Sequence, residues 1–211
     1  MIDFEDIKKY LPQYLSDYAN ANLFSELEAF PDNLDGRLYT SFLKNNPLLY
    51  QGDGISGLAH CELPDSRIEE VNGVILSNTC DISQQNDRYI PSKLVHAPII
   101  NLQKYHDMLL QKFVETGQKS EDVINQHVQT IKKQYISHIF FLPEGEGLAD
   151  DSIIFFDRLS SLPSNYVKED TIISRRLFTL SDFGFYLFLF KLSIHFTRVR
   201  ENVSRNPSTT I

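Results

Sequence analysis

The stretch that decides the fold begins with Gly52-Asp53-Gly54-Ile55, continues through Gly73-Val74-Ile75-Leu76-Ser77 and ends with Leu94-Val95-His96-Ala97-Pro98-Ile99-Ile100-Asn101. Each piece holds a short apolar run bounded by turn-forming residues, a pattern typical of a buried strand. The glycines of the first piece predict a strand that bends. Pro98 predicts a sheet edge or a bulge, because proline has no amide hydrogen to donate to a neighbouring strand.

Helices are predicted on both sides of this stretch. Apolar residues at helical spacing predict a helical extension within residues 1–50, a helical hairpin over 102–136 and a long C-terminal helix over 181–205. Within the extension, residues 3–30 carry the clearest helical spacing. Residues 37–50 favour a short helix that leads into a strand.

The remaining strands are predicted within residues 138–180, where two phenylalanine-rich strands precede a last strand over 171–180. About six short strands with one helical insertion predict an α+β chain with a single domain over residues 1–211. We expect residues 51–101 and 138–180 to form a small curled antiparallel or mixed β-barrel of the SH3-like kind. A doubly wound parallel sheet is not expected, because strands and helices do not alternate one for one.

The charge of the chain restricts its partners. A formal net charge of −8 argues against general binding to a nucleic-acid backbone, which needs clustered lysine and arginine. The clearly basic part is the C-terminal helix and tail, so any nucleic acid would bind there, through Lys191, Arg198 and Arg205. The alternative is an ordinary solvated helix face. The N-terminus lacks a signal-peptide pattern and no apolar run approaches the roughly 20 residues of a membrane span, so we expect a cytoplasmic protein that does not enter a membrane.

The strand-to-loop corner Ser77-Asn78-Thr79-Cys80-Asp81 is the most distinctive place for chemistry. Cys80 could act as a nucleophile if His60 or His96 served as its base and Asp81 oriented that histidine. The alternative is structural: cysteine often behaves as a small buried hydrophobe, and an aspartate after a strand commonly caps a turn.

Metal and cofactor sites are not expected. His60, Cys61, Cys80 and His96 are ligand types that suit zinc, but their spacing matches no zinc finger, and neighbours in a strand such as His60 and Cys61 point to opposite faces. Two cysteines also exclude a disulfide framework. Neither a phosphate-binding loop nor a dinucleotide glycine fingerprint occurs. His127 lies on an apolar helical stripe and is most simply a hydrogen-bonded core residue.

Residues 52–101 resemble the barrel core of the MazF/PemK-type toxins, which are single-strand-specific endoribonucleases. The resemblance is carried by the three pieces quoted at the outset, in the order Gly-Asp-Gly-Ile, Gly-Val-Ile-Leu-Ser and Val-His-Ala-Pro-Ile. It covers about a quarter of the chain. The toxin's catalytic arginine and threonine are not retained, because Asn72-Gly73 and Ile100-Asn101 stand at the matching positions. Loss of such an arginine removes stabilisation of charge on the transferring phosphoryl group.

The leading hypothesis is therefore a toxin-barrel-like module that has lost ribonuclease chemistry and acts by binding a protein partner. Exposed aromatic residues on the added helices would be natural interface anchors. The alternative is that the aromatic residues form a well-packed core. Together with a looser likeness to proteins of phage-defence gene neighbourhoods, the resemblance implies a bacterial defence or plasmid-maintenance system.

The alternative hypothesis is a metal-independent endoribonuclease with relocated catalytic residues. Arg88 or Arg67 would then stabilise phosphoryl charge, and Thr79, Asp81 or His96 would transfer protons. A Cys80-dependent enzyme is a third possibility. The candidate catalytic residues are thus Cys80, Asp81, Arg88 and His96.

Overall fold

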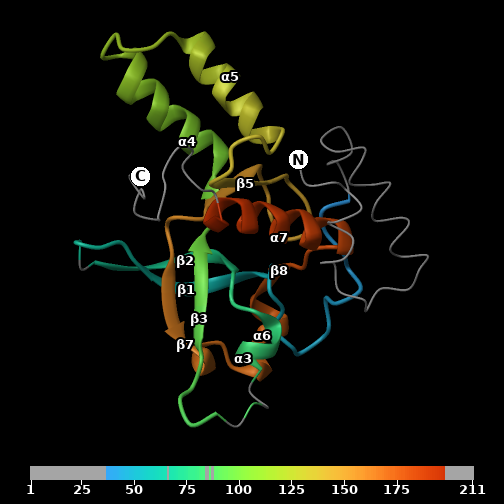
Figure 1. The fold of residues 1–211 in the computed structure, drawn as a ribbon. Helices are drawn as coiled ribbons and strands as arrows, with labels where there is room; N and C mark the ends of the chain where they lie inside the picture. The colour runs from blue at the N-terminus through green and yellow to red at the C-terminus, as the bar shows by residue number, and fades with distance from the viewer. Residues whose placement is uncertain (1–36, 66, 84–85, 87, 198–211) are drawn as a thin grey trace, which may run out of the picture.

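The computed structural model describes residues 37–65, 67–83, 86 and 88–197. The helix expected over residues 3–30 lies outside the described residues, as do Arg198 and Arg205. Within the described residues the chain is an α+β fold with two antiparallel sheets and a C-terminal helix (Figure 1). No helix in this part of the chain is long and apolar enough to cross a membrane.

The larger sheet contains five strands in the order β7-β3-β2-β1-β8. Their bounds are β1 Gly54–Cys61, β2 Ile68–Ile75, β3 Lys93–Pro98, β7 Ser160–Pro163 and β8 Arg176–Phe178. The first three form a continuous antiparallel meander, with Gly54 opposite Val74 and Val74 opposite Ala97. The strand that the glycines predict is β1, which carries an irregularity between Ile55 and Leu58.

The smaller sheet contains three strands in the order β4-β6-β5. Their bounds are β4 Ile100–Asn101, β6 Ser152–Phe155 and β5 Ile139–Leu142. The predicted hairpin consists of α4 (Leu102–Leu109), continued by a π-helical turn (Leu110–Val114), and α5 (Glu121–Lys132). It projects from this sheet as an arm (Figure 1).

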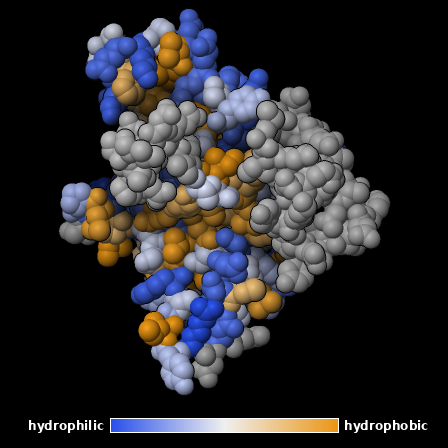
Figure 2. Space-filling model, in the orientation of Figure 1, coloured by the Kyte–Doolittle hydropathy of each residue, from blue (hydrophilic) through white to orange (hydrophobic). Residues whose placement is uncertain are grey.

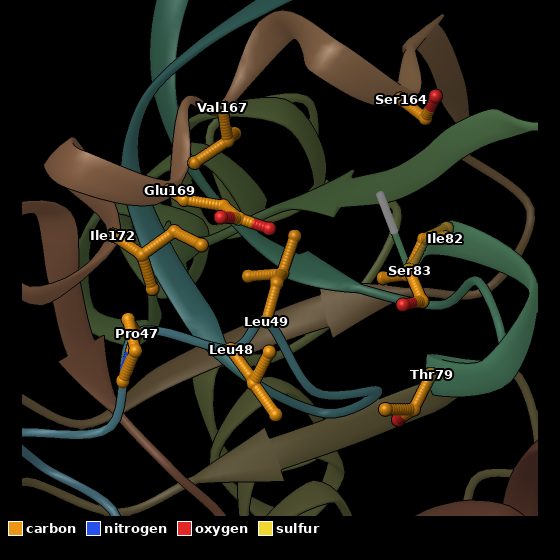
Figure 3. Close-up of a pocket in the computed structure, with 10 residues that line it drawn as sticks. All are labelled: Pro47, Leu48, Leu49, Thr79, Ile82, Ser83, Ser164, Val167, Glu169 and Ile172. Atoms are coloured by element: carbon orange, nitrogen blue, oxygen red, sulfur yellow. The ribbon is translucent and has the colours of Figure 1, made fainter. Parts of the chain in front are cut away.

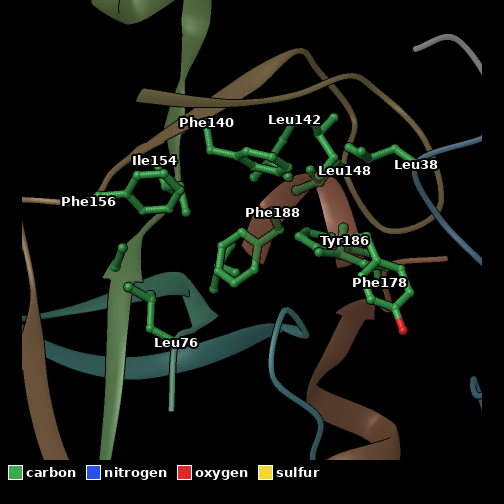
Figure 4. Packing of buried hydrophobic residues seen from close by; sticks show 14 of the residues in the cluster. Leu38, Leu76, Phe140, Leu142, Leu148, Ile154, Phe156, Phe178, Tyr186 and Phe188 are labelled. Carbon is green, nitrogen blue, oxygen red and sulfur yellow. The ribbon is translucent and has the colours of Figure 1, made fainter. Parts of the chain in front are cut away.

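Three shorter elements and one long helix complete the fold. They are α3 (Thr79–Ile82), the 3-10 turn η2 (Ser164–Tyr166), α6 (Glu169–Arg175) and α7 (Asp182–Thr197). The largest core cluster joins α7 to both sheets (Figure 4). Phe188 of α7 lies at its centre, with its ring 5.4 Å from Phe140 and 5.7 Å from Phe156.

The two faces of the five-stranded sheet are both buried. Val74 and Leu76 face the cluster around α7, whereas Ile75 faces a second cluster with Leu94 and Ile172. This alternation follows from the two-residue period of a strand. The second cluster lies on the inner side of the larger sheet, which is curled.

The barrel prediction is wrong in its closure and in its number of sheets. The larger sheet curls far enough for β7 to reach the end of β1, where the Cys61 amide donates to Ser160 Oγ at 3.3 Å. The Ser160 side chain makes this contact, and no β1–β7 ladder is formed in the described part of the chain. The strands predicted between residues 138 and 157 form a separate sheet with β4 instead of completing the curl.

Two local predictions are also corrected. The segment expected as a strand over 171–180 contains the end of α6, because Glu169 and Asp170 occupy a first helical turn and Ile172 is buried below it. Strand structure begins only at Arg176. Residues 37–50 form turns and one isolated bridge, between Tyr39 and Leu180, in place of a helix and strand. Pro98 ends β3 and is in neither an edge strand nor a bulge.

Candidate functional site

The predicted corner is an exposed surface feature formed by α3 and the loop after it. Asn78 caps α3 by accepting from the Cys80 amide at 2.9 Å, and Ser92 Oγ donates to the Asp81 carbonyl at 2.6 Å. An Arg88 nitrogen lies 2.6 Å from Asp81 Oδ1, with both side chains about half exposed. The structure therefore brings Cys80, Asp81 and Arg88 together at one corner.

His96 does not join this corner. Its side chain is fully buried in β3, and neither ring nitrogen has a hydrogen-bond partner among the described residues. Burial lowers the pKa of His96 to about 4, with a smaller contribution from His60. A histidine in this position cannot act as the base for Cys80, which is exposed. The reading of Cys80 as a small buried hydrophobe is wrong for the same reason.

His60 takes part in closing the curl. Its Nδ1 lies 2.8 Å from Ser160 Oγ, and its ring centre is 6.1 Å from that of His96. Ser160 thus bridges β7 to the end of β1 through both a side chain and the Cys61 backbone. Among the described residues, no three histidine, cysteine or acidic side chains gather in a way that could hold a metal ion.

The Gly-Asp-Gly-Ile piece has a structural role. Asp53 is fully buried and its Oδ2 lies 3.0 Å from a guanidinium nitrogen of Arg176, which is 3% exposed. Burial raises the pKa of the Asp53 carboxyl, and Arg176 counteracts this shift. Arg176 also donates to the carbonyls of Leu43 and Asn46, so the pair fastens the chain before β1 to β8.

Lys191 was expected to present positive charge to nucleic acid, and this expectation is wrong. Its side chain is 4% exposed and its Nζ donates to the carbonyls of Gln134 and Ile136 at 2.8 and 3.0 Å. It also contacts Gln134 Oε1 at 2.8 Å and the Ile139 carbonyl at 2.5 Å. Burial lowers the pKa of Lys191 to about 7. The ammonium group caps the end of the α5 arm and is not available to a ligand.

The outer side of α7 carries three exposed large apolar side chains. Phe190, Ile194 and Phe196 are 51%, 37% and 62% exposed. Figure 2 shows hydrophobic residues gathered over α7 between the two grey regions. A helix that is apolar on all sides normally lies inside a protein, which makes this exposure unusual.

Two further residues named in the sequence analysis are His127, in the arm, and Arg67, at the surface. The His127 ring and the Tyr105 hydroxyl form a hydrogen bond at 3.0 Å, which confirms the predicted hydrogen bond, but His127 is half-buried and is not a core residue. Arg67, a candidate phosphate ligand, is exposed and paired with Glu69 at 2.8 Å.

Sequence reasoning missed Arg176 and Ser160, because each acts on residues about a hundred positions away. The chain matches no known protein-family model, and no curated protein matches it.

Proposed function

We propose that the chain is a non-catalytic module that binds another protein, and that a helix of the partner packs against the outer face of α7. The observation that carries this proposal is the exposure of Phe190, Ile194 and Phe196 on a helix whose inner face already fills the core. Completing the burial of such half-exposed side chains contributes on the order of 1 kcal/mol each. Three of them suffice as anchors for a moderate interface.

The shape of the face favours a helix as the occupant. Ser193 lies at its centre and is exposed, with Phe190 and Ile194 on one side and Phe196 on the other. A small residue between larger neighbours lets a second helix approach closely and place its side chains between them. No charged side chain is exposed between positions 189 and 197, since Lys191 points inward. The matching face of the partner is therefore apolar.

A toxin-barrel origin is part of this proposal. It is supported by the antiparallel meander of β1, β2 and β3, which has the strand order that the MazF/PemK resemblance implies. We place the protein in the bacterial cytoplasm, as a component of a phage-defence or plasmid-maintenance system. The two free cysteines, Cys61 and Cys80, suit a reducing compartment.

Photo-crosslinking tests the surface directly. A benzophenone amino acid is placed at Ser193, with the same group at Tyr89 as a control on a distant exposed loop. We expect the Ser193 probe to crosslink in cells to an apolar helix of one other protein. The double variant Phe190→Asp/Ile194→Asp should abolish that product, and the Tyr89 probe should not give it.

The other possible products contradict the proposal. A crosslink from Ser193 to residues 1–36 of the same chain would mean that the face is covered internally. A crosslink to a second copy would mean self-association. Illumination that yields no product would mean that the face binds nothing.

One observation favours an endoribonuclease as the second candidate function. Arg88 lies beside Asp81 at an exposed corner, so a cation and an acid–base group are adjacent there. Incubation of the purified protein with a mixed RNA pool without metal tests it. Cleavage that Arg88→Ala abolishes would place this function ahead of protein binding, whereas intact RNA would eliminate it.

A further inference from the structure

A small pocket lies beside the corner, between the 47–49 segment, α3 and α6 (Figure 3). Its volume is about 60 Å³, several times the roughly 10–15 Å³ that one water molecule needs. Its walls are mainly aliphatic: Leu48, Leu49, Ile82, Val167 and Ile172. Three of these wall residues, Ile82, Val167 and Ile172, belong to the core cluster inside the curl. The pocket is therefore an opening into the edge of the core.

A single carboxylate lines this pocket and is exposed to solvent. Glu169, the first residue of α6, lines the pocket and extends toward Leu49 in Figure 3. No hydrogen bond or ion pair within the described residues engages its carboxylate. The arginine of the same helix is committed elsewhere, because Arg175 donates to the carbonyls of Ser56 and Gly57. Arg88 is likewise held by Asp81.

We propose that this pocket binds a short peptide segment of a partner that carries an aliphatic side chain next to a lysine or arginine. The aliphatic group enters the pocket and contacts Leu49, Val167 and Ile172. The neighbouring cation pairs with Glu169. Charge complementarity favours this occupant over an anionic one, because Glu169 is the one charged side chain among the described residues that line the pocket, and its carboxylate attracts a cation and repels an anion.

The site is independent of α7. It lies on the inner side of the five-stranded sheet, whereas α7 packs on the opposite face. Loss of peptide binding at the pocket would leave the α7 proposal standing, and loss of the α7 partner would leave the pocket proposal standing.

Blocked dipeptides serve as probes, with binding followed through the methyl NMR signals of Leu49 and Ile172. Acetyl-Leu-Lys-amide should shift both signals with millimolar affinity. Acetyl-Ser-Lys-amide should bind at least tenfold more weakly, because it lacks the aliphatic group. Acetyl-Leu-Glu-amide should also bind more weakly, because its carboxylate meets Glu169.

Two matched substitutions complete the test. Glu169→Gln should weaken binding of the Leu-Lys probe by about threefold, the effect of losing one exposed ion pair. Asp170→Asn removes the next acid along the chain, which does not line the pocket, and should leave affinity unchanged. The proposal is overturned if the probe does not shift these methyl signals, if all three probes bind equally, or if the two substitutions have the same effect.

Discussion

Lys191 Nζ lies 2.8 Å from Gln134 Oε1, and this contact joins the C-terminal helix to the end of the α4–α5 arm. The Gln134 side chain in turn pairs with the Phe141 backbone, accepting from its amide at 3.0 Å and donating to its carbonyl at 2.7 Å. Three structural elements thus meet at one buried polar group. Such groups stabilise a fold only while every partner is present.

The first prediction concerns this contact. Lys191→Met keeps the length of the side chain but leaves the carbonyls of Gln134, Ile136 and Ile139 without their donor, so unfolding free energy should fall by about 2–4 kcal/mol. Urea denaturation measures the change. Lys133→Met is the matched control on an exposed residue and should change stability by less than about 0.5 kcal/mol. Equal effects of the two substitutions would contradict the role of Lys191.

The second prediction concerns the pair between Asp53 and Arg176. Arg176→Met leaves a buried carboxylate without its cation and should destabilise the protein by about 3–5 kcal/mol. Combining it with Asp53→Asn should restore part of that loss. A double-mutant cycle in urea measures the coupling. Strictly additive effects would show that the two side chains do not stabilise each other.

The third prediction is a pH dependence caused by His96. Its pKa is about 4 in the folded protein because of burial, against 6.5 for the exposed side chain. The unfolded chain binds the additional proton first as pH falls, so His96 should lower stability progressively between pH 6.5 and 4. The loss is on the order of 3 kcal/mol. His96→Phe should remove this component of the slope of unfolding free energy against pH. An unchanged slope would contradict the assignment.

The fourth prediction separates protein binding from thiol chemistry. Cys80 is exposed, and no hydrogen bond among the described residues joins its thiol to a histidine, so Cys80→Ser should leave both stability and binding of the α7 partner unchanged. Thermal unfolding and the Ser193 crosslink measure the two properties. Loss of crosslinking in Cys80→Ser with an unchanged melting temperature would point to a role for the thiol.

The sequence alone predicts the local part of this fold well. The three quoted pieces contain the start of β1, the end of β2, nearly all of β3 and all of β4. Short apolar runs between turn-forming residues are typical of buried strands, so these parts are predicted from the local sequence. The helical arm over 102–136 is confirmed for a similar reason: its two apolar stripes are interrupted near Gly117, which has a φ of +69°. Each of these features is determined by residues that lie close to it in the sequence.

Features that depend on distant residues could not be predicted. Ser160–Pro163 has a polar start and no apolar pattern, yet it forms β7 because β3 offers it an edge. Lys191 seemed to lie on a polar face, but α7 is apolar around its whole circumference, so periodicity gives no orientation. Only the carbonyls at the end of α5 explain why this lysine turns inward.

In the candidate site, too, contacts between residues close in the sequence could be predicted, whereas those between distant residues could not. Asp81 and Arg88 lie seven residues apart and their proximity follows from a short loop. The burial of His96 depends on the curl of the whole sheet. The pocket beside Glu169 combines three segments, within residues 47–49, 79–83 and 164–172, that are distant in the sequence, and no sequence pattern marks it.

The most direct test of the account is the mass of the native assembly, measured by sedimentation on protein purified from its own cells. We expect a stoichiometric complex with one other protein that dissociates to the 24.4 kDa chain in Phe190→Asp/Ile194→Asp, a variant that still unfolds cooperatively. A wild-type protein that sediments as a lone 24.4 kDa chain, or a complex that survives both substitutions, would contradict it.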